Sequence, residues 1–227
     1  MSNENQVKHL HVTYNDIHNL IRKYTPKIAE EFSPDLLIAI GMSFFSKPRR
    51  GGGFFPARVM RTFLRESTTN KTLQIQAIGL SLYEPVEGVA EEKIAEEVVR
   101  TQWLGADAGK MLLGKRVLIV DEVDDTRKTL SFALTELQKD VENELLKHPE
   151  GDLEALRAST KFGIFVVHNK NKPKLAELPG GTVYYAGQEV DDVWLDYPWE
   201  STNIEEHDKL AALDVKNAAA AVKAAEV

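Results

Sequence analysis

The run "RVLIV" at residues 116–120 constrains the fold more than any other part of the chain. Its apolar residues follow one another with no alternating polar position. That pattern is typical of a parallel strand that is covered on both faces. The pattern predicts an α/β fold with a central, mostly parallel sheet flanked by helices, because strand-like and helical stretches alternate along the chain. The other strand-like runs are 36–40, 73–80, 97–103, 162–168 and 183–186, and the helical stretches are 56–65, about 126–147 and from about Asn203.

A further helix is expected near the N-terminus, over residues 15–32. Ile17, Ile21 and Ile28 follow one another at helical spacing. Pro26 lies inside this pattern, and proline removes a backbone donor and crowds the preceding turn of a helix. Pro26 is therefore predicted to kink or divide this helix.

The composition limits the classes of protein to which the chain can belong. At 227 residues the chain can bury one sizeable core, so one domain is favoured over two. The lack of cysteine excludes disulfides and thiolate metal sites and is typical of the cytosol or nucleus. A net charge of -7 argues against nucleic-acid binding, and no apolar run approaches the roughly 20 residues of a membrane span. We expect a single-domain cytoplasmic protein that binds neither nucleic acid nor membrane.

The stretch "VDEVDDTRKT" at 120–129 carries the clearest chemical signal. Four carboxylates, those of Asp121, Glu122, Asp124 and Asp125, directly follow the buried strand. Ligands of α/β sheets bind at the carboxyl ends of strands. Adjacent carboxylates suit a sugar diol or a metal ion, and the amides, hydroxyls and cations of 126–129 suit a phosphate. An ordinary acidic helix N-terminus is the alternative, since Asp and Thr also cap helices.

This stretch resembles the phosphoribosyl pyrophosphate-binding signature of type I phosphoribosyltransferases. The resemblance extends from about Tyr14 to His207, and "LSLYE", "RTQWL", "HNKNKPK" and "VWLDYPWE" occur in the order found in fungal xanthine and hypoxanthine–guanine phosphoribosyltransferases. It implies a type I fold with a small hood for the base, a Mg²⁺ cofactor and a homodimer. The single domain would span 1–227, with a core over about 14–207 and an Ala-rich helical tail over 208–227.

The resemblance also implies roles for the acidic loop. Asp121 and Glu122 would bind the ribose 2- and 3-hydroxyls and magnesium, and Asp125 would act as general base near N7 of a purine. Asp124 has no implied role and is expected to be solvated. The backbone and hydroxyls of the following loop would surround the 5-phosphate: Thr126, Arg127, Lys128 and Thr129.

Arg127 departs from the pattern of this family, because many relatives have glycine there. Either the loop needs no positive φ at this position, or its shape differs. The side chains of Arg127 and Lys128 can alternatively add charge-assisted contacts to the phosphate. The sequence leaves these alternatives open.

Aromatic and basic residues near the C-terminus are candidates for binding the base. Taken alone, the tryptophans of "DDVWLDYPWE" are more typical of core packing. By resemblance, Trp194 stacks on a purine and the Leu195 backbone reads its exocyclic groups, while Lys170 donates to a 6-oxo oxygen, with Lys172 as the alternative. Glu200 matches a position near a second magnesium ion. A lysine donor favours 6-oxopurines over adenine.

The glycine turn after residues 36–40 is interrupted by nine residues, 42–50. Removing them leaves "IAIGGGGFFPARV", a continuous pyrophosphate loop of the fungal type. In one hypothesis the segment bulges outward and the loop still forms from Gly41, Gly51, Gly52 and Gly53, with Arg50 near pyrophosphate. In the other it is an error of gene prediction or an alternative splice product.

The resemblance predicts transfer of ribose 5-phosphate from phosphoribosyl pyrophosphate to N9 of a 6-oxopurine. A glutamate-rich segment at 83–100 matches a loop that closes over the reacting groups in this family. One alternative is a ligand-sensing regulator with the same fold and no catalysis. Another is a receiver domain fed by phosphotransfer, which leaves the two C-terminal tryptophans unexplained.

Overall fold

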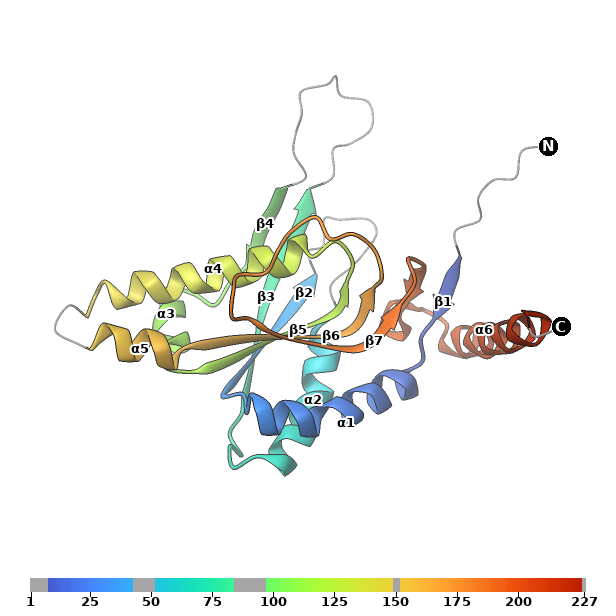
Figure 1. Cartoon of the computed structure of the whole chain (residues 1–227), viewed down its shortest axis with the longest axis horizontal. Coiled ribbons are helices and arrows are strands. Elements are labelled where there is room, and N and C mark those ends of the chain that lie inside the picture. Colours follow the sequence, from blue (N-terminus) through green and yellow to red (C-terminus); the bar gives the residue numbers. More distant parts are fainter. Residues whose placement is uncertain (1–7, 43–51, 84–96, 149–151, 226–227) are drawn as a thin grey trace, which may run out of the picture.

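The centre of the molecule is a six-stranded sheet with the strand order β4-β3-β2-β5-β6-β7 (Figure 1). The computed structural model describes residues 8–42, 52–83, 97–148 and 152–225. All neighbouring strands of this sheet are parallel except β3 and β4. The predicted α/β fold with a mostly parallel sheet is therefore confirmed. The strands are β2 (Leu36–Met42), β3 (Gln74–Tyr83), β4 (Glu97–Gln102), β5 (Arg116–Asp124), β6 (Lys161–Lys170) and β7 (Val183–Val190).

Helices cover both faces of the sheet. The first pair, α1 (Tyr14–Glu31) and α2 (Phe54–Ser67), lies below the sheet in Figure 1. The second group comprises α3 (Ala108–Leu112), α4 (Lys128–Leu145) and α5 (Leu153–Ser159), which contribute to one hydrophobic cluster, and α4 lies above the sheet in Figure 1. This coverage explains the continuous apolar run of β5, whose residues 117–120 are all 0% exposed.

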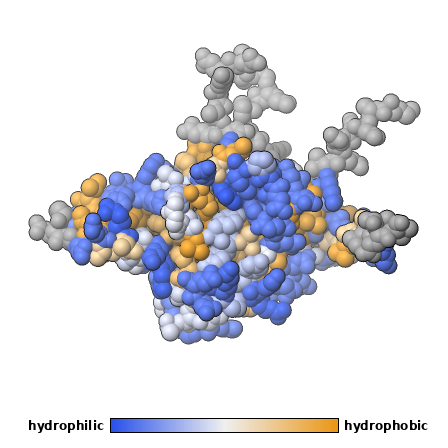
Figure 2. Space-filling view, viewed as in Figure 1, coloured by the Kyte–Doolittle hydropathy of each residue, from blue (hydrophilic) through white to orange (hydrophobic). Residues whose placement is uncertain are grey.

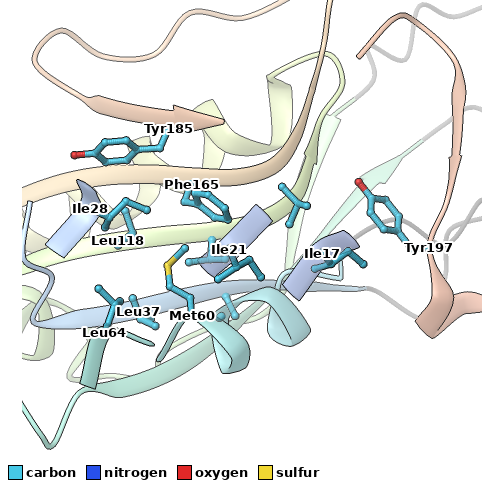
Figure 3. Close-up of a cluster of buried hydrophobic side chains, with 14 of the residues drawn as sticks. Ile17, Ile21, Ile28, Leu37, Met60, Leu64, Leu118, Phe165, Tyr185 and Tyr197 are labelled. Atoms are coloured by element: carbon cyan, nitrogen blue, oxygen red, sulfur yellow. The ribbon is translucent and has the colours of Figure 1, made fainter. Parts of the chain in front are cut away.

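Two hydrophobic cores result, one on each face of the sheet. Side chains of successive strand residues point to opposite faces. Leu37 and Ala39 therefore belong to the core under α1 and α2, whereas Leu36, Ile38 and Ile40 belong to the core under α4. Figure 3 shows the first core, in which side chains of α1, α2 and the central strands interlock.

Helix α1 is continuous, so of the two predicted effects of Pro26, a kink or a division, the division does not occur. A capping box of Thr13 and Asp16 starts the helix, which then runs past Pro26 without a break. Ile21 and Ile28 lie on either side of the proline and are both 0% exposed. Their burial against the sheet favours the helical path over the cost of the proline.

A two-stranded parallel sheet and a long helix complete the described structure. The strands are β1 (His9–His11) and β8 (Trp194–Asp196), followed by a short 3-10 helix, η1 (Pro198–Glu200), and by α6 (Ile204–Ala225). Helix α6 projects away from the central sheet (Figure 1). The face drawn in Figure 2 is mostly hydrophilic. Among the described residues, no helix has the length and apolar character needed to cross a membrane.

Candidate active site

The carboxyl ends of β5 and β6 bring together the acidic loop and the lysine-rich segment 170–174. Asp124 of β5 lies opposite Asn169 of β6 in the sheet register. Lys170 Nζ lies 3.4 Å from Asp125 Oδ2, and Lys172 Nζ lies 2.8 Å from Asp125 Oδ1. The structure thus places the predicted general base against both of the lysines considered for the 6-oxo group.

Asp192 faces the same two lysines from the segment before β8. Its Oδ1 lies 3.5 Å from Lys170 Nζ and 3.0 Å from Lys172 Nζ. The hydrogen bond to Asp125 raises the pKa of Lys172, and the bond from Lys172 lowers the pKa of Asp192. The side chain of Lys170 is 7% exposed and that of Lys172 is 26% exposed, so Lys170 is the deeper of the two.

Asp121 and Glu122 form a buried pair of carboxylates. They are 5% and 1% exposed. The pKa of Asp121 is raised well above its usual range, first by burial and then by the nearby charges of Glu122 and Asp124. Carboxylates buried this closely are stabilised by hydroxyl donors or by a cation. The pair is therefore suited to holding a sugar diol or a divalent ion.

Aromatic residues that follow β8 fix Glu122, a contact that the sequence did not reveal. Trp199 Nε1 donates to Glu122 Oε2 at 3.1 Å. The Tyr197 hydroxyl donates to the backbone oxygen of Glu122 at 3.0 Å. The two rings stack with centroids 4.9 Å apart and an interplanar angle of 7°. The only sequence signal for this contact was the aromatic character of "DYPWE".

His168 contacts Tyr197 and is buried in its neutral form. Its Nδ1 is 2.9 Å from the Tyr197 hydroxyl. The Tyr197 hydroxyl donates its proton to the backbone oxygen of Glu122, so His168 Nδ1 is the donor of the bond to Tyr197. Burial lowers the pKa of His168 to about 4.

The low pKa of His168 predicts a loss of stability in mild acid. An unfolded histidine has a pKa of about 6.5, so below that pH the unfolded state binds a proton that the folded state refuses. Stability should fall as the pH drops from about 7 to about 4, and this group alone contributes on the order of 3 kcal/mol over that range. In His168→Gln, the fall in unfolding free energy between pH 7 and pH 4.5 should be about 2 kcal/mol smaller. Urea unfolding measures it.

The wild-type protein, unfolded in parallel over the same pH range, is the reference for this prediction. An unchanged pH dependence in His168→Gln would contradict the assignment.

Asp124 is buried, so the prediction that it is solvated is wrong. It is 1% exposed. Its Oδ2 accepts from Arg127 Nε at 2.9 Å and from the Tyr184 hydroxyl at 2.9 Å, and its Oδ1 lies 3.5 Å from Lys174 Nζ. These partners explain the burial, because a carboxylate enters a protein interior only when it is paired. Burial and the nearby charge of Asp124 raise the pKa of Tyr184.

Arg127 occupies the left-handed region, with φ 68° and ψ -5°. The loop therefore has a positive φ at this position, and the first alternative, that the loop needs no positive φ there, is wrong. The conformation is sterically unfavourable for a residue with a Cβ. Arg127 immediately precedes α4, and its backbone oxygen accepts from Ser131 N at 3.0 Å.

Lys174 fastens the loop after β6 to the acidic loop, and the sequence did not single it out. Its Nζ donates to three backbone oxygens, those of Asp124 at 2.8 Å, Asp125 at 3.0 Å and Lys170 at 3.0 Å. A further backbone bond of 3.0 Å joins Leu175 N to Thr126 O. Burial lowers the pKa of Lys174. These bonds tie the proposed base side of the site to the proposed phosphate side.

The glycine turn closes where the chain leaves and re-enters the described structure. Gly41 and Gly52 form an isolated antiparallel bridge, and Gly53 N donates to Ile40 O at 3.0 Å. A Cβ on Gly52 would collide with Glu122 Oε2 and Trp199 Nε1. Arg50, Gly51 and the rest of 43–51 lie outside the described residues, as does 84–96 of the predicted closing loop.

Lys128 and Thr129 begin α4, and the other predicted residues lie on or next to β8. Trp194 is half-buried, with its ring centroid 6.2 Å from that of His9, and Leu195 is 8% exposed. Glu200 is exposed and lines a hollow of about 280 Å³ together with His11 and other residues. The described residues contain no group of three or more His, Cys, Asp or Glu that could hold a metal ion. Glu200 and the carboxylate pair thus do not form such a group among the described residues.

Two fungal enzymes resemble this chain over nearly its whole length. Hypoxanthine-guanine phosphoribosyltransferase of Schizosaccharomyces pombe is 48% identical over 210 residues, which cover 89% of this chain and 94% of that protein. The chain belongs to the purine phosphoribosyltransferases. Xanthine phosphoribosyltransferase 1 of Saccharomyces cerevisiae is 44% identical over 213 residues, with 89% and 94% coverage.

A solved structure has a similar fold. A hypothetical protein from Neisseria gonorrhoeae with bound ppGpp is 34% identical, with a TM-score of 0.69 over 93% of this phosphoribosyltransferase and 99% of that chain. No family model matches the chain. The resemblance inferred from the acidic loop is confirmed: the protein is a purine phosphoribosyltransferase enzyme.

Proposed function

We propose that this phosphoribosyltransferase transfers ribose 5-phosphate from phosphoribosyl pyrophosphate to N9 of xanthine, hypoxanthine or guanine. The products are the nucleoside 5'-monophosphate and pyrophosphate. The observation that carries this proposal is Asp125 lying between Lys170 and Lys172 beside the buried carboxylate pair. The names of the fungal relatives support 6-oxopurines as the substrates of this chain.

The acidic loop and the glycine turn would bind the phosphoribosyl half. Asp121 and Glu122 would accept hydrogen bonds from the ribose hydroxyls. The amides and hydroxyls of 126–129, at the start of α4, would bind the 5-phosphate, because the first amides of a helix and the helix dipole both favour an anion there. The amides of Gly41, Gly52 and Gly53 would bind pyrophosphate, with Arg50 and Gly51 as further proposed contacts.

Lysine and aspartate would read the edge of the purine. Lys170 Nζ and Asp125 Oδ2 lie 3.4 Å apart, so a donor and an acceptor stand side by side. A 6-oxopurine presents an acceptor at O6 next to a protonated N7, which matches this pair. Asp125 would take the N7 proton as the N9 bond forms. Lys172 is the alternative donor, Trp194 the stacking surface, and Leu195 the backbone reader of exocyclic groups.

Magnesium is the proposed cofactor, and the carboxylate pair fits it. Asp121 and Glu122 are buried side by side, and the raised pKa of Asp121 reflects a charge that lacks full compensation. Mg²⁺ binds through one or two carboxylates plus substrate oxygens and keeps several waters. Once bound, it would neutralise the leaving pyrophosphate. Glu200 is retained as the proposed contact of a second ion.

A homodimer in the cytoplasm completes the proposal. Phe54, Phe55 and Tyr14 are 52%, 48% and 46% exposed. Phe55 stacks on Trp199 at 5.3 Å, so the exposed rings adjoin the site. Aromatic side chains exposed together are typical of protein contact surfaces. The lack of cysteine supports the cytoplasm.

Product formation with a panel of purines tests the function directly. The protein is incubated with phosphoribosyl pyrophosphate, Mg²⁺ and one of xanthine, hypoxanthine, guanine or adenine, and pyrophosphate release is measured. At least one 6-oxopurine should react, and adenine should react at least about 100-fold more slowly, because its amino group is a donor facing a lysine donor. Binding of phosphoribosyl pyrophosphate without release would support the regulator instead.

A further inference from the structure

Asp124 and Arg127 form a nearly buried ion pair beside the proposed phosphate loop. The Asp124 side chain is 0% exposed and that of Arg127 is 23% exposed. Two guanidinium nitrogens of Arg127 reach Asp124 Oδ2, Nε at 2.9 Å and Nη2 at 2.8 Å. Charge-assisted bonds of this kind are strong and fix the geometry of both partners.

A tyrosine of β7 supports the pair from the other side. The Tyr184 hydroxyl donates to Asp124 Oδ2 at 2.9 Å, and the Arg127 guanidinium carbon lies 5.0 Å from the centre of the Tyr184 ring. The Arg127 guanidinium is thus engaged by a carboxylate and by an aromatic face. The Arg127 side chain is therefore held in place by Asp124 and Tyr184 without a phosphate.

The ion pair stabilises an unfavourable backbone conformation of Arg127. Its φ of 68° is unfavourable for any residue other than glycine, and such strain persists only where the surroundings fix it. Because the guanidinium is anchored to the last residue of β5, the left-handed turn is anchored to the sheet. The turn directs the chain into α4, whose first amides face the proposed phosphate position.

We propose that Asp124 and Arg127 are a positioning pair that fixes the left-handed turn and so arranges the phosphate loop before the substrate arrives. The Arg127 side chain acts on the loop and not on the 5-phosphate. This proposal rests on the proposed function in one respect, namely that residues 126–129 bind the 5-phosphate. The opposite view, in which Arg127 contacts the phosphate directly, makes different predictions for the two partners.

A double-mutant cycle distinguishes the two views. Arg127→Gly removes the guanidinium while glycine accepts the positive φ, and Asp124→Asn removes the charge while its oxygen still accepts from Tyr184. Each single variant breaks this ion pair, although Lys174 Nζ still lies 3.5 Å from Oδ1 of Asp124 in Arg127→Gly, so each should raise the KM for phosphoribosyl pyrophosphate by about 10-fold or more. The double variant has no Asp124–Arg127 pair left to break and should resemble the milder single variant instead of multiplying the two effects. Turnover at saturation should stay within about threefold.

An exposed pair of the same chemistry is the matched control. Arg157 also binds a carboxylate through Nε and Nη2, at 2.8 Å and 2.7 Å from the two oxygens of Glu142, but both side chains are 51% exposed. Arg157→Ala, Glu142→Gln and their combination should leave the KM for phosphoribosyl pyrophosphate unchanged. A shift in these controls equal to that in the Asp124 and Arg127 variants would overturn the proposal.

Direct phosphate contact would give the opposite pattern. Asp124→Asn would then release the guanidinium toward the phosphate and lower the KM, and Arg127→Gly would keep its full effect in the double variant. That pattern overturns the positioning role.

Amide hydrogen exchange provides a second readout that needs no turnover. Ser131 N donates to Arg127 O, so each single variant should speed exchange at Ser131 by about 10-fold or more, and the double variant should not multiply the effects. Wild-type exchange at Ser131 in both single variants would overturn the pair. An inactive wild-type protein would refute the proposed function, while this exchange pattern still decides whether the pair holds the turn.

Discussion

Replacing Asp125 with asparagine should lower turnover with a 6-oxopurine by about 100-fold to 10,000-fold. Asparagine has the same size and can still receive a hydrogen bond from Lys172, which is 2.8 Å away in the wild-type protein. It cannot take a proton from N7. The loss should therefore appear in kcat, while purine affinity stays within about threefold, because the lysine donor and the stacking surface remain. Steady-state kinetics and calorimetric purine binding measure the two quantities.

Asp192→Asn is the matched control for this variant. Asp192 contacts the same two lysines, but its side chain is 52% exposed whereas that of Asp125 is 14% exposed. Its replacement removes a neighbouring charge without removing the proposed base, so turnover should fall less than about 10-fold. Near-wild-type turnover in Asp125→Asn would contradict the role of Asp125, and equal losses in both variants would indicate a general disturbance of the lysines.

The central sheet could be predicted from the sequence because burial on both faces leaves a pattern in a single strand. The run at 117–120 is continuously apolar, and each of its residues is 0% exposed. The short elements could not be predicted in this way. Helix α3 has five residues and β1 has three, too few for a periodic pattern to appear.

The main elements of the site were also predictable, because parallel strands end at one edge of a sheet. Asp125 and Lys170 are far apart in the chain, yet both lie at the carboxyl ends of central strands, and the structure brings them within 3.4 Å of each other. Asp124 was not predictable by the same reasoning. Its burial depends on Tyr184 of β7 and on Lys174 of the loop after β6. A local sequence pattern does not predict contacts between residues this far apart in the chain.

The interrupted glycine turn is the place where the sequence left most open. The bridge between Gly41 and Gly52 shows that the chain returns to the point where it left β2. This geometry supports the part of the first hypothesis that keeps Gly52 and Gly53 in the loop. Whether residues 42–50 are present in the natural protein is a separate question, which sequencing of the transcript answers.

The second strong prediction concerns the replacement of Gly53 by alanine, and two other glycine variants serve as comparisons. Gly180→Ala is the matched control. No atom lies within 4 Å of a Cβ placed on Gly180, so its replacement should leave stability and substrate affinity unchanged. Gly52→Ala is an intermediate case. Its Cβ would collide with Glu122 and Trp199, whose side chains bond each other, so Gly52→Ala should raise the KM for phosphoribosyl pyrophosphate and also lower stability.

Gly53→Ala should destabilise the protein by about 1–3 kcal/mol or more and raise the KM for phosphoribosyl pyrophosphate at least about 10-fold. A Cβ on Gly53 would collide with the backbone oxygen of Val120 and lie 2.9 Å from that of Ile40. Neither carbonyl can withdraw, because both belong to central strands whose residues are completely or almost completely buried. The turn must then move away from the sheet, which breaks the 3.0 Å bond from Gly53 N to Ile40 O and displaces the proposed pyrophosphate amides. Urea unfolding and substrate kinetics measure both effects, and wild-type values for both would show that the turn does not need this close approach.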